Sequence, residues 1–181
     1  MEGVQVSAKE IPYSGIAGRA AFAPSGPERA TARIELSRIA TVEVASGIQG
    51  FRLLRLGGSS FQGFVRDQYT TLPDVADRPL HMWLDLEWLY TDPAGAFTSG
   101  APTAAVRALV YDVFQCFESG SIQQVIYQIA TKMLAEIPSI SEVHLEANNR
   151  TWETVAERGS ETGVYTDPRP PYGVLGLRLR R

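Results

Sequence analysis

Few side chains in this sequence are suited to act as a base, a nucleophile or a metal ligand. The 181 residues include two histidines, one cysteine and two lysines: His81, His144, Cys116, Lys9 and Lys132. A three-histidine or cysteine-based metal site needs more ligands than these, so we expect no metal. Both histidines lie in strand-like patterns, where a structural histidine is commoner than a catalytic base. Cys116 fits an inert, partly buried thiol better than a nucleophile.

Composition excludes several other functions. The glycine spacing matches neither a phosphate-binding loop nor a dinucleotide fingerprint. The chain is 44% hydrophobic and 20% charged with a formal net charge of −3, which excludes a disordered tail and argues against nucleic acid as a partner. It has no run of about 18 apolar residues for a membrane span, and its first residues lack a secretory pattern. We expect a cytoplasmic protein without membrane contact.

The stretch 59–78, SSFQGFVRDQYTTLPDVADR, carries the most unusual side chains. It places two phenylalanines around a glycine, continues with an Arg-Asp pair, and ends on Asp77-Arg78 just before a strand pattern. Composition alone indicates an irregular surface loop. In that interpretation Phe61 only anchors the loop, and Arg78 pairs with Asp77 or Asp67.

Alternating apolar and polar residues predict the strands around this loop. We expect strands at 32–44, 51–56, 82–90, 143–147 and 174–179, with a turn at 47–50 between the first two. Residues 13–29, rich in Gly, Ala, Pro and Ser, indicate a loop or a long hairpin tip.

Two apolar stripes predict two helices after the loop. The first stripe runs from Val106 to Phe117, with Pro102 in the first turn. The second helix begins after Ser121 as N-cap and stops at Pro138. Two such helices can cover one face of an antiparallel sheet, so we predict an α+β fold in the order strands, helix pair, strands. Its exposed sheet edges favour an oligomer.

The 59–78 stretch resembles a segment of the urate oxidases (uricases) that reads F-x-G-F-x-R-D-x-Y/F-T-T-L-x-x-x-x-D-R. Further matches follow in the family's order at 41–48, 121–123, 147–152 and 165–168. The resemblance covers about residues 31–181, and residues 1–30 match only weakly. It implies that 1–181 form a single T-fold (tunnelling-fold) domain like the C-terminal half of uricases: an antiparallel β-sheet with two helices on one face.

The resemblance implies roles for five residues. Phe61 would stack on the purine, because an aromatic face does so at low entropic cost. Arg78 would bind one edge of the urate anion with two parallel charge-assisted bonds. Gln123 would bind the opposite edge, next to the free backbone N–H of Ile122 in the first helical turn. Asn148 would hold the oxygen or water site and so take a catalytic role.

Besides Phe61 and Arg78, two more of these positions have alternatives. Gln123 could be a solvent-exposed capping residue, although the adjacent Gln124 could equally cap. Asn148 could be a turn former, with Asn149 as the aligned residue. Arg150 stands where many uricases have a histidine, so the proton relay usually assigned to that histidine is not carried over.

The implied function is that of a cofactor-independent urate oxidase, in which urate, O2 and water give 5-hydroxyisourate and hydrogen peroxide. The family's catalytic lysine and threonine belong to its N-terminal T-fold, and the sequence around Lys9 does not match that lysine. We therefore expect a second T-fold domain or subunit as partner, in a tetrameric or higher assembly. The alternative is a catalytically incomplete T-fold that binds a purine or only assembles. A zinc-dependent pterin-type T-fold enzyme would need a histidine cluster that two scattered histidines do not supply.

Overall fold

The computed structural model describes residues 3–10, 13–16, 21–71, 73–97, 102–151, 154–158, 162–171 and 173–181. The strands are β1 (Val4–Lys9), β2 (Tyr13–Ile16), β3 (Ala21–Pro24), β4 (Arg29–Leu36), β5 (Thr41–Arg55), β6 (Leu80–Tyr90), β7 (Ile140–Arg150), β8 (Thr154–Arg158), β9 (Thr162–Tyr165) and β10 (Leu175–Arg180). The helices are α1 (Thr103–Cys116) and α2 (Ile122–Glu136), preceded by a 3-10 turn at Gly95–Phe97. None of the described helices is long and apolar enough to cross a membrane.

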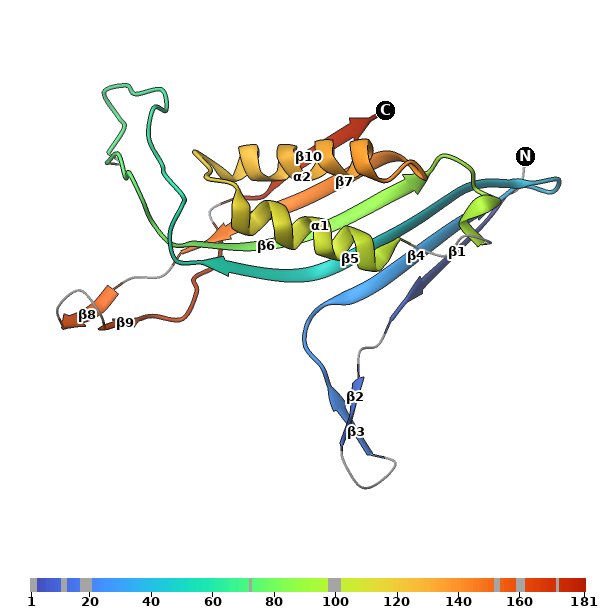
Figure 1. The fold of residues 1–181 in the computed structure, drawn as a ribbon, viewed down its shortest axis with the longest axis horizontal. Coiled ribbons are helices and arrows are strands. Elements are labelled where there is room, and N and C mark those ends of the chain that lie inside the picture. Colours follow the sequence, from blue (N-terminus) through green and yellow to red (C-terminus); the bar gives the residue numbers. More distant parts are fainter. Residues whose placement is uncertain are drawn as a thin grey trace.

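Six strands form one sheet in the order β1-β4-β5-β6-β7-β10, and every neighbouring pair is antiparallel. Helices α1 and α2 lie side by side across one face of this sheet (Figure 1). We call the opposite face the open face. The hairpins β2–β3 and β8–β9 extend away from the sheet (Figure 1). The predicted α+β fold and its order of strands, helix pair and strands are confirmed.

The core lies between the sheet and the two helices, and β6 shows how the sequence builds it. Its even-numbered residues are buried: Leu80, Met82, Leu84, Leu86, Trp88 and Tyr90. The buried sides of the helices meet them with Val106, Leu109, Val110, Val113 and Phe114 from α1 and Val125, Ile126, Ile129, Ala130 and Met133 from α2. Since strand side chains alternate between faces, the odd-numbered residues of β6 lie on the open face, and most of them are polar or aromatic.

The predicted strand at 32–44 is wrong, because a turn divides it. Ser37 N–H donates to the carbonyl of Ala40 at 2.9 Å, and the Ser37 hydroxyl accepts from Ala40 N–H at 3.2 Å. Residues before this turn belong to β4, and those after it begin β5. Serine commonly forms such local bonds to the backbone, which compete with a continuous strand.

The predicted turn at 47–50 is also wrong, since β5 runs through it. Gly47 has no room for a Cβ, which would lie 2.6 Å from the carbonyl oxygen of Leu86 on β6. Gly50 has φ +78° where the register with β6 shifts, and its N–H donates to Asp85 Oδ1 at 2.7 Å. Gly47 therefore allows β6 to approach closely, and Gly50 lies at a bulge, both inside one long strand.

The helix predictions are confirmed with small shifts at the ends. Pro102 is the N-cap of α1 and lies just before its first turn. Ser121 caps α2 as predicted, because its hydroxyl accepts from Gln124 N–H at 3.2 Å. Residues 13–29 contain the predicted hairpin as β2–β3, whereas the β8–β9 hairpin was missed.

Candidate functional site

The 59–78 loop joins β5 to β6, and backbone hydrogen bonds hold its two arms together. Phe61 N–H donates to the carbonyl of Val75 at 2.8 Å, and Val75 N–H donates back to Phe61 at 2.9 Å. Arg78 N–H donates to the carbonyl of Ser59 at 2.8 Å. This pairing brings Phe61 and Arg78 to the same place although they lie at opposite ends of the loop.

Two aromatic rings and a guanidinium stack at this place. The rings of Phe61 and Phe64 are nearly parallel, with centroids 4.5 Å apart and an interplanar angle of 23°. The guanidinium carbon of Arg78 lies 4.8 Å from the centre of the Phe61 ring. Such an arrangement combines a flat apolar surface with a cation beside it, which suits a planar anionic ligand.

Arg78 is half-buried and does not form the ion pair with Asp67 or Asp77 that composition allows. Asp77 accepts from Ser59 N–H at 3.2 Å, and Asp67 accepts from Tyr69 N–H at 2.9 Å. Burial lowers the pKa of Arg78, and its Nε is shielded from solvent without a hydrogen-bond partner in the described part of the chain. A buried donor normally has an acceptor, so this N–H is available to a ligand.

The turn between α1 and α2 is hydrogen-bonded to the base of the loop. Ser60 N–H donates to the carbonyl of Ser119 at 2.9 Å, and Ser119 N–H donates to Gly58 at 3.0 Å. These bonds place the start of α2, with Ile122 and Gln123, beside the arm that carries Phe61. The first backbone N–H groups of a helix have no partner within it, so this end of α2 favours a ligand that offers acceptors or negative charge.

Of the two adjacent glutamines, Gln124 performs the capping. Its N–H donates to the Ser121 hydroxyl, and its Oε1 accepts from Gly120 N–H at 2.9 Å. The Gln123 side chain is exposed and makes no hydrogen bond to any residue that the structure describes. The capping alternative for Gln123 is therefore wrong. Ile122 is half-buried and packs against the core, which fixes the position of its backbone.

Arg55, at the end of β5, ties the end of α1 and the α1–α2 turn to the sheet, and the sequence pattern did not reveal it. Its guanidinium donates to the carbonyls of Phe114, at 2.8 Å, and Phe117, and to the Ser119 hydroxyl. A cation is favourable at the C-terminal end of α1, where carbonyls lack helical partners. Burial lowers the pKa of Arg55. Arg55 thus holds the turn against which the loop is bonded.

A hollow of about 400 Å³ lies between the loop base and the α1–α2 turn. It is lined by Gly58, Ser59, Ser60, Gln62, Ala76, Asp77, Glu118, Ser119 and Gly120. None of the five predicted site residues lines it. Ser60 and Gln62, the chain neighbours of Phe61, and Asp77, the chain neighbour of Arg78, line it instead.

Asn148 lies on the open face of β7, opposite Trp83 on β6. Its position inside a strand excludes the turn-former alternative. Asn149 is opposite Met82, which is fully buried, so strand alternation directs Asn149 toward the helices and Asn148 toward the open face. No hydrogen bond or ring contact joins Asn148 to the other four predicted residues in the portion of the chain that is described.

Asn148 belongs instead to a cluster around Trp83. Arg150 Nε donates to Asn148 Oδ1 at 2.9 Å, and the Arg150 guanidinium carbon lies 3.8 Å from the Trp83 ring centre. The guanidinium of Arg52, on β5, lies 4.5 Å from the same ring. Trp83 Nε1–H donates to His81 Nε2 at 3.3 Å. Burial, reinforced by the charges of Arg150 and Arg52, lowers the pKa of His81, which therefore favours the neutral form.

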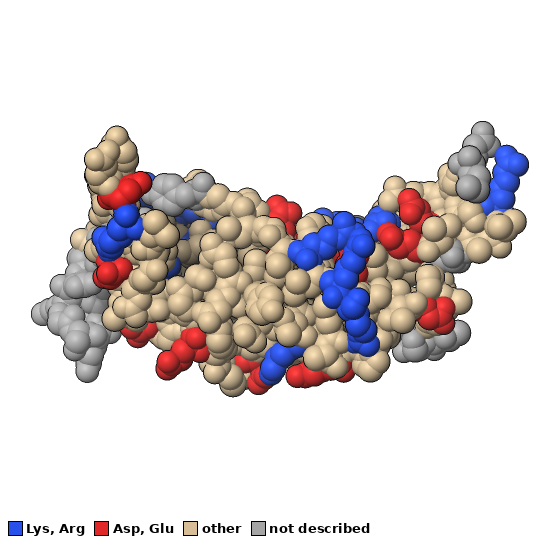
Figure 2. Space-filling model, turned by 90° about the horizontal axis from the view of Figure 1, so that it is seen from above, with Lys and Arg blue, Asp and Glu red and all other residues tan. Residues whose placement is uncertain are grey.

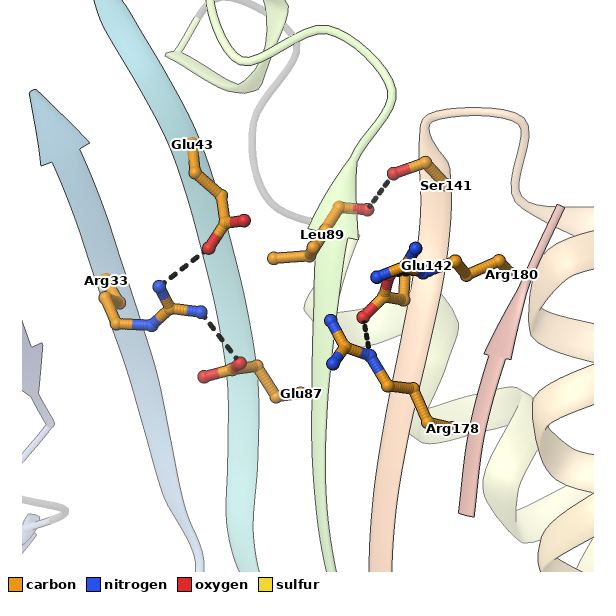
Figure 3. Close-up of polar contacts among 8 residues, drawn as sticks. All are labelled: Arg33, Glu43, Glu87, Leu89, Ser141, Glu142, Arg178 and Arg180. Carbon is orange, nitrogen blue, oxygen red and sulfur yellow. Dashed lines mark hydrogen bonds and ion pairs between the residues drawn. The ribbon is translucent and has the colours of Figure 1, made fainter.

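Further along the open face, ion pairs connect strands of the sheet (Figure 3). Arg33 on β4 contacts Glu43 at 2.7 Å and Glu87 at 3.0 Å, and Glu142 on β7 contacts Arg178 and Arg180 on β10. On the side of the molecule shown in Figure 2, basic and acidic residues are interspersed, and several adjoin one another. Among the described residues, no group of three or more His, Cys, Asp or Glu side chains is arranged to hold a metal ion.

Comparison with known proteins identifies one family. The Uricase family model matches residues 44–175. The chain is 36% identical to a uricase of Haloferax volcanii, covering 100% of this chain and 65% of that protein. It is 34% identical to a uric acid degradation bifunctional protein of Bacillus subtilis, covering 100% of this chain and 40% of that protein.

Solved structures agree with the sequence matches. A hyperthermostable mutant of Bacillus sp. TB-90 urate oxidase superposes with a TM-score of 0.87 at 34% identity, over 99% of this chain and 65% of that one. The uricase of Arthrobacter globiformis gives a TM-score of 0.84 at 27% identity, over 99% and 63% of the two chains. The predicted T-fold is confirmed. The chain spans about 40% to 65% of the length of these relatives.

Proposed function

The chain belongs to the uricase family, and on that premise we propose that it is the C-terminal T-fold half of a cofactor-independent urate oxidase. In the proposed reaction, urate, O2 and water give 5-hydroxyisourate and hydrogen peroxide. This chain supplies the residues that bind urate. A second T-fold supplies the catalytic lysine and threonine.

The observation that carries the proposal is the pairing of Phe61 with Arg78. The Phe61 ring, on which Phe64 stacks at 4.5 Å in this structure, is a flat surface on which an oxopurine can stack in place of Phe64, and stacking of this kind contributes on the order of 1 kcal/mol. The guanidinium is half-buried, its Nε has no hydrogen-bond partner in the part of the chain that is described, and its carbon lies 4.8 Å from the centre of the Phe61 ring. A planar guanidinium can form two parallel bonds to the edge of the urate anion, which an ammonium group cannot.

The start of α2 binds the opposite edge of urate in this proposal. The Gln123 amide offers one donor and one acceptor, which complement the alternating N–H and C=O groups of a lactam. The N–H of Ile122 adds a donor at the helix end that favours an anion. Support comes from the exposed, unbonded state of Gln123 and from the bonds that hold the α1–α2 turn against the loop.

A second T-fold domain or subunit completes the proposed site, within a cytoplasmic assembly of four or more T-fold units. The sheet edges support this partner, because β1 and β10 each have one neighbour in the described sheet. Unpaired edges of this kind are usually paired or covered. We assign Lys9 no catalytic role, because the sequence around it does not match the family's lysine; it lies on the edge strand β1, where its ammonium donates to Gln49 Oε1 at 2.7 Å.

The test is to mix the chain with the N-terminal T-fold half and follow the ultraviolet absorbance of urate. We expect turnover by the mixture and none by either half alone, and Arg78→Met should abolish it. Calorimetric titration of the isolated chain with urate or 8-azaxanthine measures binding as a second readout. Tight binding without turnover would support the purine-binding module instead. If the protein neither binds nor turns over urate, both functions are refuted.

A further inference from the structure

We propose that Arg150 is a positioning residue that fixes the side-chain amide of Asn148, so that the amide oxygen faces Arg150 and the NH2 group is presented to the reacting oxygen or water. This inference rests on the proposed function, which assigns Asn148 to that oxygen or water site. It gives a role to a residue that stands where many uricases have a histidine.

The chemistry of the two side chains allows only one orientation of the amide. A guanidinium carries donors and no acceptor, whereas an amide has one acceptor end and one donor end. Arg150 Nε donates to Asn148 Oδ1 at 2.9 Å. Rotating the amide by half a turn would set NH2 against N–H and leave two donors facing each other. A neutral imidazole, by contrast, has a donor and an acceptor nitrogen, so it could form a hydrogen bond with either end of the Asn148 amide.

The position of Arg150 is itself fixed by several contacts. Its guanidinium lies 3.8 Å from the centre of the Trp83 ring, and its Nη1 donates to the carbonyl of Arg169 at 3.4 Å. Trp83 is held by its bond to His81 and by its register opposite Asn148 on β7. A stacked, multiply bonded guanidinium loses little further freedom when it holds the amide.

The arrangement separates two parts of the proposed reaction. Phe61, Arg78 and Gln123 bind urate, whereas Asn148 meets only the oxygen or water. A loose amide would therefore slow the chemical step more than it weakens urate binding. Loss of such an interaction lowers kcat and leaves KM nearly unchanged.

Arg52 offers a matched control for Arg150. Both guanidiniums lie over the Trp83 ring, one from β5 and the other from β7, the two neighbours of β6. Of these two arginines, only Arg150 donates to the Asn148 side chain. Replacing either arginine removes one charge and one ring contact, but only one replacement frees the amide.

The kinetic experiment uses the assembly of this chain with its second T-fold half. Arg150→Met should lower kcat on the order of 10- to 100-fold and leave the KM for urate unchanged. This is the rate ratio that corresponds to the free energy of one hydrogen bond to a charged group. Arg150→Lys should restore part of the loss, because an ammonium still donates. Arg52→Met should change kcat less than twofold. Equal losses in the two methionine variants, or a loss confined to KM, would overturn the proposal.

An NMR experiment on the isotopically labelled chain tests the geometry without urate turnover. The Arg150 Nε–H proton should exchange slowly with solvent. The Asn148→Ala substitution should shift the resonance of this Arg150 proton and speed its exchange. An unaffected proton would overturn the positioning role. If the assembly turns over no urate, the proposed function fails and the catalytic part of this inference fails with it. The NMR result then still decides whether Arg150 orients the amide.

Discussion

Arg78 and Phe61 form a cation–ring pair, with the guanidinium carbon 4.8 Å from the ring centre. The same loop contains a second pair of this kind, because the Arg66 guanidinium lies 4.7 Å from the centre of the Phe64 ring. The two arginines differ in their surroundings. Arg78 is half-buried and its Nε has no hydrogen-bond partner among the described residues, whereas Arg66 is exposed and paired with Asp74 at 3.1 Å. Arg66 is therefore an internal control for the proposed role of Arg78.

We predict that Arg78→Lys weakens urate binding by on the order of 10- to 100-fold, because the planar fork and one or more charge-assisted bonds are lost while the charge remains. Arg66→Lys should change the affinity less than twofold. Calorimetric titration of the assembly with urate measures both. An unchanged affinity in Arg78→Lys would show that Arg78 contributes only its charge, and similar losses in the two variants would show that Arg78 binds urate no more specifically than Arg66 does.

Substitutions of the two adjacent glutamines of α2 should affect urate binding and the free energy of unfolding separately. Gln123→Leu should weaken urate binding without lowering the free energy of unfolding, since its side chain has no bond to a described residue. Gln124→Leu should lower the free energy of unfolding by about 0.5–1 kcal/mol, because the bond to Gly120 at the start of α2 is lost.

Thermal unfolding and urate titration of the same two proteins make this comparison. If Gln124→Leu weakened binding and Gln123→Leu did not, the aligned ligand residue would be Gln124, and the proposed site would have to be rebuilt around it.

The sequence predicts the fold well where one physical signal dominates. The alternation in β6 and the apolar stripes of α1 and α2 reflect burial on one side, and the structure places those residues in the core. The prediction fails at glycines. Gly47 and Gly50 indicate a turn by composition, but their roles depend on a neighbouring strand that a local pattern does not contain.

In the candidate site, too, residues with a local sequence signal could be predicted and residues that depend on distant neighbours could not. The loop pattern placed Phe61 and Arg78 in one segment, and the structure brings them into contact. Arg55 and the contacts of Arg150 could not be found this way, because a lone arginine in a strand carries no local signal. Their partners are carbonyls, a hydroxyl and a ring from other elements, which become neighbours only when the sheet and helices assemble.

His81 should make stability depend on pH. Burial, with help from the charges of Arg150 and Arg52, lowers the pKa of His81 below its ordinary value of 6.5. The unfolded chain therefore takes up a proton at a higher pH than the folded one. The free energy of unfolding should fall as pH decreases from about 6.5 toward the folded-state pKa of His81.

Two variants check this pH dependence. His81→Gln should remove this contribution to the slope, and Arg150→Met should raise the pKa of His81 in an NMR titration. Arg33→Met, which removes a charge elsewhere on the open face, should leave that pKa unchanged. A His81 resonance that titrates at or above the ordinary value would contradict the prediction.

Glu142 should stabilise the attachment of β10 to the sheet. Its side chain is only 8% exposed and accepts bonds from Arg178 and Arg180. Burial alone would raise the pKa of Glu142, but the two arginines outweigh it and the pKa is lowered. A carboxyl with a lowered pKa stabilises the fold above its unfolded value of about 4.5, and this stabilisation is lost as pH falls through the folded-state pKa.

Glu142→Gln should accordingly lower the free energy of unfolding by about 1–3 kcal/mol at neutral pH, because two charge-assisted bonds become weaker neutral ones. The difference from the unaltered protein should shrink as pH falls below about 4.5, where the carboxyl itself becomes protonated. Glu146→Gln, an exposed position on the same face of β7, is the control and should change stability by less than about 0.5 kcal/mol. Urea unfolding at several pH values gives these numbers. A Glu142→Gln deficit that stayed constant down to low pH would mean that the side chain acts through packing, since a loss of ion pairing must disappear once the carboxyl is neutral in both proteins.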